Sequence, residues 1–304
     1  MNILLSANFG RAMILLAVSL QAIGKVMFGT WLTHIPSPLF VFVSFALTAA
    51  LFLSWSRHGV GERAWGPLLL LNISTALTFL CFFYALKLIE PAIVSAVEIG
   101  IGPILTVGIT LLLTAQRPPA LRVVVCIGVL VGCTILGFSA VHGSGFHSFG
   151  MDAWLGLTAS VAAGVGAVLI TMASKSLLKR GWKFGAVLAH RFYLILPMSF
   201  IMAAGTDLAA IEWSGSLVAI LLIVSVVGVL APLYLLQVGI GRCEPYTVMV
   251  TMSALPILTF LIEGFSPRYT WSGMTVAGLA VVTAFLLIDV VANTRRSSAS
   301  SAHS

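Results

Sequence analysis

The sequence predicts an all-α integral membrane protein with ten transmembrane helices, arranged as two inverted repeats of five. Three observations lead to this prediction. The 304-residue chain is 60% hydrophobic and 8% charged, with a mean hydropathy of +1.10, whereas roughly 25% of the residues of a soluble domain are charged. Apolar stretches long enough to cross a bilayer recur along the whole chain. One motif also recurs at the same place in the two halves.

Charged clusters, prolines and glycines divide the chain into ten apolar spans, each near the length of about 20 residues that a transmembrane helix needs. The first repeat, residues 12–141, contains spans at 12–32, 38–55, 67–86, 91–113 and 121–141. The second repeat, residues 153–291, contains spans at 153–174, 185–204, 216–237, 245–265 and 271–291. Residues 1–11 are expected to form a cytoplasmic N-terminus, and the polar residues 292–304 a disordered cytoplasmic tail.

Positive charges lie mostly at one side of these spans. If the N-terminus is cytoplasmic, twelve of the sixteen Lys and Arg residues fall in inside segments, two (Lys87 and Arg268) in outside loops, and two (Lys25 and Arg191) within spans. Because cytoplasmic loops carry the excess of Lys and Arg, both termini are predicted to be cytoplasmic. The net charge of +7 is then an orientation signal rather than a nucleic-acid surface. The expected location is a bacterial inner (plasma) membrane.

The fourth and ninth spans contain matching segments. Residues 90–106 read EPAIVSAVEIGIGPILT, and residues 244–259 read EPYTVMVTMSALPILT. Both begin with Glu-Pro and reach Pro-Ile-Leu-Thr after eleven or ten further residues. Because five is an odd number, the second copy must enter the membrane from the opposite side. The sequence therefore predicts an inverted repeat, in which a central site can face one side and then the other.

Ten spans in two inverted halves, short loops, and a proline in the fourth and ninth spans resemble the drug/metabolite transporter superfamily of the EamA type, over roughly residues 10–292. Residues 94–103 (VSAVEIGIGP) are similar to a segment of threonine/homoserine exporters that has an acidic residue shortly before Gly-Pro. Glu98 takes the acidic position here, with one residue more before Pro103. The resemblance implies secondary active export of small metabolites, through a cavity lined by the first, third and fourth helices and their partners in the second half.

Lys25 and Glu98 are the main candidates for a transport site, because charged groups inside a bilayer are costly and mark functional positions. Lys25 lies about 14 residues into the first span, and Glu98 about seven residues into the fourth, so both sit roughly 10 Å below the same surface. We expect them to face each other as an ion pair or a proton-sharing pair. The alternatives are a snorkelling lysine and a neutral carboxyl group bonded to a neighbouring helix.

Weaker polar residues extend this candidate site. Helical spacing places some of them on the faces of Lys25 and Glu98 and others on further stripes; they are equally plausible as substrate contacts and as interhelical hydrogen-bond partners. We name Gln21, Asn72, Ser95, Tyr234, Gln237 and Thr251 as candidate substrate or coupling residues. His190 is a possible proton relay. Arg191 is expected to snorkel to the cytoplasmic interface.

Two prolines are candidate hinges. Pro103 and Pro256 each remove a backbone hydrogen bond within a span and should kink it. Gly102, directly before Pro103, favours the hinge interpretation, although prolines are also tolerated in such helices as packing kinks.

Several function classes fit an integral membrane protein. We expect proton-coupled export of an amino acid or amino-acid-like metabolite by alternating access. The alternatives are export of another metabolite, such as an amino-acid-derived metal chelator or a drug, and lipid flipping, for which more basic residues within the spans would be expected. An intramembrane enzyme would need a catalytic constellation. Its candidates, His142, Ser144 and His147, share one short loop without an acid nearby.

The expected partners follow from the transporter hypothesis. They are a small polar metabolite, protons as the coupling ion, and the lipid bilayer. We expect a monomer or a weak homodimer, no enzyme activity, no cofactor, no metal and no nucleic acid. The chain has no G-x-x-x-x-G-K-[ST] motif, so ATP is not the direct driver.

Overall fold

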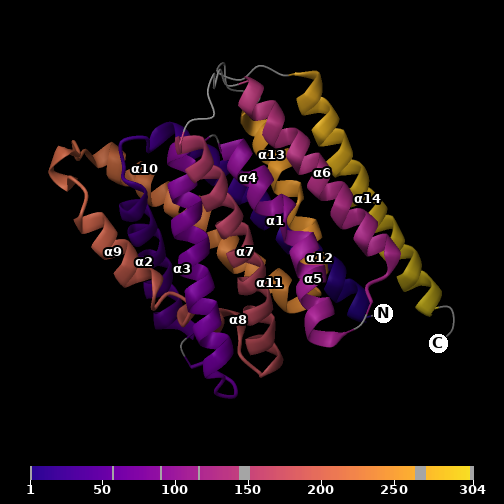
Figure 1. Cartoon of the computed structure of the whole chain (residues 1–304). Coiled ribbons are helices and arrows are strands. Elements are labelled where there is room, and N and C mark those ends of the chain that lie inside the picture. The colour runs from indigo at the N-terminus through magenta and orange to yellow at the C-terminus, as the bar shows by residue number, and fades with distance from the viewer. Residues whose placement is uncertain are drawn as a thin grey trace.

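The computed structural model describes residues 2–56, 58–89, 91–115, 117–143, 151–263 and 272–301. These residues form helices and connecting segments, without a strand among them (Figure 1). The first half contains α1 (Asn2–Trp31), α2 (Ser37–Ser56), α3 (Trp65–Leu88), α4 (Pro91–Gly100), α5 (Gly102–Thr114) and α6 (Ala120–Gly143). The second half contains α7 (Met151–Lys179), α8 (Phe184–Ala189), α9 (Ile195–Ala204), the 3-10 helix η1 (Leu208–Ala210), α10 (Gly215–Ser225), the π-helix η2 (Val226–Leu230), α11 (Ala231–Arg242), α12 (Pro245–Met252), α13 (Ala254–Glu263) and α14 (Gly273–Ser301).

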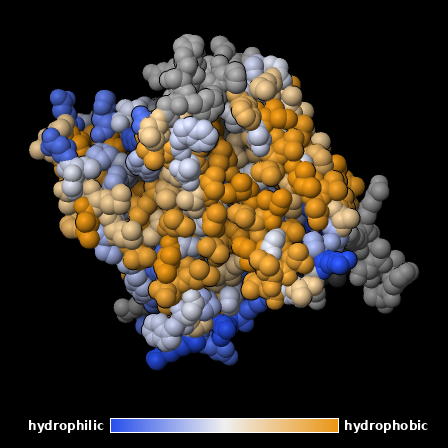
Figure 2. All heavy atoms as spheres, viewed as in Figure 1, coloured by the Kyte–Doolittle hydropathy of each residue, from blue (hydrophilic) through white to orange (hydrophobic). Residues whose placement is uncertain are grey.

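The outside of this bundle suits a lipid environment. Within the described residues, nine helical segments are long and apolar enough to cross a membrane, and Ile195–Ala204 is a shorter apolar helix. Apolar side chains cover the middle of the face in Figure 2, and hydrophilic residues gather at its upper left and lower margins. Trp55 and Trp65, both 74% exposed, lie at helix ends, where tryptophan favours the membrane interface. The predicted all-α membrane fold is confirmed.

Each helix contact between the two halves has an equivalent contact in which the two halves have changed places. The third span packs on the sixth (α3 with α7), and the eighth packs on the first (α11 with α1). The fourth packs on the sixth (α4 with α7), and the ninth packs on the first (α13 with α1). The pairs α6 with α14, α2 with α9 and α4 with α13 each join a span to its counterpart. This is the packing expected of two repeats related by a two-fold axis.

The fourth and ninth spans are both interrupted just before their prolines. α4 ends at Gly100 and α5 begins at Gly102, while α12 ends at Met252 and α13 begins at Ala254. Proline lacks the N–H that would continue the helical ladder and fits the first turn of a new helix. Thr106 and Thr259, the last residues of the repeated Pro-Ile-Leu-Thr, are buried and donate to the carbonyls of Gly102 and Leu255 at 2.9 Å. The repeated letters therefore form the same local structure twice.

Several helix boundaries differ from the predicted spans, most clearly at the seventh span and at the C-terminal tail. The seventh span, predicted as one helix at 185–204, consists of α8 and α9 with a non-helical segment between them. α14 continues to Ser301, where a disordered tail is predicted from residue 292, because no proline or glycine interrupts it. Residues 302–304, Glu90 of the repeated motif, and Ser144 and His147 of the loop lie outside the described residues.

Candidate functional site

A cavity lies where the two halves meet. It is lined by residues of α1, α2, α3, α4, α7, η2, α11 and α12, together with Arg191. Its volume is ≈ 60 Å³, whereas ligand pockets usually have at least about 300 Å³. The cavity must therefore widen before it can hold a metabolite. The lining residues are Gln21, Gly24, Lys25, Phe40, Thr78, Phe79, Phe82, Phe83, Glu98, Ala167, Ile170, Thr171, Arg191, Gly228, Val229, Leu233, Leu236 and Met252.

Lys25 and Glu98 form an ion pair at one end of this cavity. The Lys25 Nζ atom lies 3.1 Å from Glu98 Oε2, and the two side chains are 8% and 9% exposed. Nζ also donates to Ser95 Oγ at 3.1 Å and lies 4.2 Å from the centre of the Phe82 ring. α1 supplies the lysine, and α4 supplies the acid and the serine one helical turn apart. The pairing expected from the sequence is present, while its role in transport stays a prediction.

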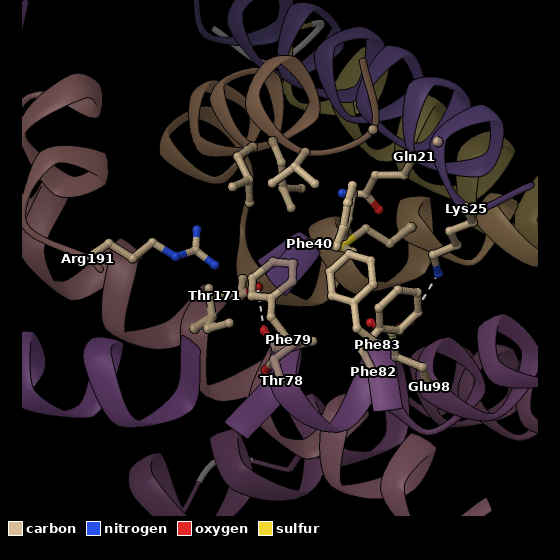
Figure 3. A pocket seen from close by; sticks show the side chains of 18 residues that line it. Gln21, Lys25, Phe40, Thr78, Phe79, Phe82, Phe83, Glu98, Thr171 and Arg191 are labelled. Atoms are coloured by element: carbon tan, nitrogen blue, oxygen red, sulfur yellow. Dashed lines mark hydrogen bonds and ion pairs between the residues drawn. The ribbon is translucent and has the colours of Figure 1, made fainter. Parts of the chain in front are cut away.

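Arg191 is a second buried cation in the cavity. The sequence predicts that it snorkels to the interface, and this is wrong: the residue is 1% exposed and lines the cavity. Its Nε donates to Thr75 Oγ1 at 3.0 Å, and the guanidinium carbon lies 5.7 Å from the centre of the Phe79 ring. Figure 3 shows Arg191 and Lys25 entering from opposite sides, with aromatic rings between them. The cause is the break between α8 and α9, which contains Arg191 and turns its side chain inward.

Asn72 of α3 holds this break in place. Its Oδ1 accepts a hydrogen bond from the Tyr193 backbone N–H at 2.9 Å, and its Nδ2 donates to the His190 carbonyl at 3.0 Å. These bonds satisfy two backbone groups that a continuous helix would have paired internally. Asn72 is therefore an interhelical partner that positions Arg191, rather than a member of the cavity lining.

Comparison with known proteins agrees with this architecture. Residues 8–138 match the family model described as "EamA-like transporter family". This segment of the first half is therefore similar to an EamA-like transporter domain. A solved structure titled "Crystal structure of protein" superimposes with a TM-score of 0.72 and 19% sequence identity, over 95% of this chain and 98% of that one, so the two share a fold. No match was found among curated proteins.

The segment that matches this family model contains the whole first-half part of the site. Lys25, Ser95 and Glu98 all fall within residues 8–138. Members of the family are membrane transporters of the drug/metabolite transporter superfamily. The apolar helices and the match to this family together support an integral, multi-pass membrane protein.

The cavity includes Gln21 and excludes several other predicted residues. Gln21 lies one turn before Lys25 and lines the cavity. Thr251 is not among the lining residues, and its hydroxyl donates to the Thr247 carbonyl at 2.7 Å. Its neighbour Met252 lines the cavity from the second half of the chain.

The eighth span turns a different face toward the cavity from the one that the sequence predicts. Tyr234 is 38% exposed and stacks on Phe52 at 5.7 Å between ring centres, while Leu233 and Leu236 line the cavity. The π-helical turn of η2 explains the difference, because it inserts one residue and rotates the following face. Gln237 is fully buried outside the cavity lining, and neither atom of its amide has a hydrogen-bond partner in the described part of the chain.

His190 lies beside the site rather than in it. Its Nδ1 shares a hydrogen bond with the Tyr193 hydroxyl, and its ring packs edge-on against Trp182 at 5.6 Å between centres. It is half-buried and does not line the cavity. The hinge candidates Gly102, Pro103 and Pro256 all fall at the helix interruptions described above. Across the described residues, no three His, Cys, Asp or Glu side chains come together as a metal site.

Proposed function

We propose that this chain is a secondary active transporter that exports an amino acid or an amino-acid-like metabolite by alternating access, coupled to protons. The observation that supports this function most is the buried Lys25–Glu98 ion pair in a cavity between the two halves. Glu98 is the one carboxylate among the described residues that line this cavity. A single carboxylate in that position can exchange a proton and hold a substrate amine in turn.

The pair offers a simple coupling mechanism. When a proton binds to Glu98 Oε2, the carboxylate loses its charge and its attraction for Lys25 Nζ, 3.1 Å away, falls. A substrate ammonium group needs the charged carboxylate, so proton and substrate compete for Glu98. Competition for one group couples the two flows in opposite directions. Moving one charge down the membrane potential supplies about 2.3 kcal/mol per 100 mV, which is enough to bias such a cycle.

The interrupted helices offer the movement that alternating access requires. The breaks at Ile101 and Ser253 lie in the paired fourth and ninth spans, which contribute Glu98 and Met252 to the cavity. Broken helices near the middle of inverted repeats are common at transporter binding sites, where one bundle rocks against the other. In this proposal the half-helices tilt at these breaks and open the cavity to alternate sides.

The test is transport by the purified full chain in proteoliposomes. We expect an imposed pH gradient to drive movement of at least one of a panel of labelled amino acids. Glu98→Gln should abolish the gradient dependence, while Glu212→Gln, which alters an exposed acid before α10, should behave as the wild type. Accumulation in inside-out membrane vesicles tests the export direction. Gradient-driven transport that survives in Glu98→Gln would contradict the coupling role.

A further inference from the structure

Arg191 is a buried positive charge that no acid in the described part of the chain neutralises. The ion pairs among the described residues are Arg11–Asp289, Lys25–Glu98 and Arg122–Glu244. Arg191 is 1% exposed, and its one hydrogen bond within the described part of the chain runs from Nε to Thr75 Oγ1. Thr75 is neutral. The rings of Phe79 and Phe192, 5.7 and 6.0 Å from the guanidinium carbon, supply weaker cation–π contacts.

Among the described residues, the charges that line the cavity therefore do not balance. Lys25 is paired with Glu98, and Arg191 adds one further positive charge. An arginine stays charged even when buried, and leaving a buried charge without a partner is strongly unfavourable. A binding site that carries such a charge is stabilised when a ligand of opposite charge enters. The imbalance points to a negatively charged group on the molecule that the cavity accepts.

The residues along α3 indicate how such a ligand would be oriented in the cavity. Thr75, Phe79 and Phe82 lie on one face of α3; Arg191 contacts the first two, and Lys25 lies over the third. The seven residues from Thr75 to Phe82 span about 10 Å along the helix axis. Between these ends, the buried Thr78 hydroxyl has no hydrogen-bond partner in the described part of the chain and lines the same cavity. The cavity thus has a cationic end, an aromatic and hydroxyl middle, and an ion-paired end (Figure 3).

We propose that Arg191 binds the acidic group, a carboxylate or a phosphate, of the transported molecule. The guanidinium offers two parallel N–H donors to such a group. The body of the molecule then packs against Phe79 and Phe82, and an ammonium group far enough from the acidic group meets Glu98 at the other end. The substrate class is therefore an organic acid or a zwitterion. This inference rests on the proposed function, because it requires that the transported substrate enters the cavity. It adds which group of the substrate is recognised, and by which residue.

The test compares acids with neutral analogues in a thermal-stability assay of the wild-type full chain in nanodiscs. The carboxylate arm pairs L-threonine with L-threoninamide, L-phenylalanine with L-phenylalaninamide, and succinate with succinamide. The phosphate arm pairs glycerol 3-phosphate with glycerol. We expect at least one acid to raise the melting temperature. Its neutral analogue should need an at least tenfold higher concentration to give the same increase. Stabilisation by neutral analogues as strong as by the acids, or by no acid at millimolar concentration, would overturn the proposal.

Three variants separate recognition from folding. Arg191→Met removes the charge, so the stabilisation by acids should disappear while the ligand-free melting temperature stays the same or rises. Arg191→Lys keeps the charge but loses the paired donors, and its affinity should fall at least tenfold. Arg180→Gln alters an exposed arginine directly after α7 and should match the wild type. Unchanged stabilisation of Arg191→Met by the acids would also overturn the proposal. Because binding needs no gradient, these outcomes are independent of whether transport is coupled to protons.

Discussion

Gly24 of α1 and Gly228 of η2 meet backbone to backbone at the wall of the cavity. A Cβ atom added to Gly24 would lie 2.2 Å from the Cα atom of Gly228, and one added to Gly228 would lie 2.8 Å from the Cα atom of Gly24. Small residues allow transmembrane helices to approach this closely. Lys25 directly follows Gly24, so this contact sets how far the lysine reaches into the cavity.

Gly24→Ala should disrupt this contact. The added methyl group would meet backbone atoms, which a rotamer change cannot move, so α1 must shift away from η2. We expect a melting temperature lowered by several degrees and transport reduced at least tenfold, because Lys25 moves with α1. Gly108→Ala is the matched control, since a Cβ atom there has no neighbour within 4 Å and alanine favours the helix. Equal melting temperatures and rates for the two variants would contradict this prediction.

Lys25 and Glu98 should stabilise the fold only as a pair. Removing one partner of a buried ion pair leaves an uncompensated charge and costs about 3–5 kcal/mol, whereas replacing both with apolar residues costs far less. We therefore expect Lys25→Met and Glu98→Met each to lower stability, and the double variant Lys25→Met/Glu98→Met to be more stable than either. Unfolding of the four proteins in the same mixed micelles measures the coupling. Additive losses in the double variant would show that the two charges act independently.

Much of the site follows from the sequence because its causes are local. Charged side chains within apolar spans are unfavourable in contact with lipid. Lys25 and Glu98, which lie at the same depth, must therefore contact each other or another polar group. Pro103 and Pro256 break their helices through their own covalent structure. The repeated Pro-Ile-Leu-Thr segments also form the same local structure, since the threonine hydroxyl bonds a carbonyl one turn back.

The remainder depends on contacts between segments far apart in the sequence. Arg191 reaches the cavity because the seventh span breaks, and that break is held by Asn72, more than a hundred residues earlier. Pro197 lies in the first turn of α9, as Pro256 lies in the first turn of α13, but it does not indicate that Arg191 turns toward the cavity. Tyr234 faces away because the π turn of η2 shifts the helical register, and a count at 3.6 residues per turn cannot include such a shift.

Asn72→Leu should loosen the segment that carries Arg191. The change removes the acceptor for the Tyr193 N–H and the donor to the His190 carbonyl, and each buried group left unpaired costs about 1–3 kcal/mol. We expect faster hydrogen exchange in a peptide covering residues 188–195 and weaker binding of acids. A peptide from the middle of α7 serves as the internal control and should exchange at the wild-type rate. Protection of residues 188–195 that equals the wild type would rule out the positioning role.

Pro103→Ala and Pro256→Ala should separate stability from turnover. Alanine restores an N–H donor and favours a continuous helix, so each variant can join its two half-helices across Ile101 or Ser253. If the half-helices must tilt during transport, each variant should be at least as stable as the wild type. Its maximal transport rate should fall at least tenfold. Pro67→Ala is the matched control, because Pro67 occupies the first turn of α3, where no helical N–H bond is needed.

Binding measurements on the same proline variants identify the step that is affected. A hinge changes the rate at which the cavity opens and leaves the groups that line it in place, since neither proline is among the lining residues. The affinity for the ligand should therefore change less than threefold while the maximal rate falls. A wild-type rate in Pro103→Ala/Pro256→Ala would mean that the breaks only relieve packing. A loss of affinity equal to the loss of rate would instead place the effect at the binding site.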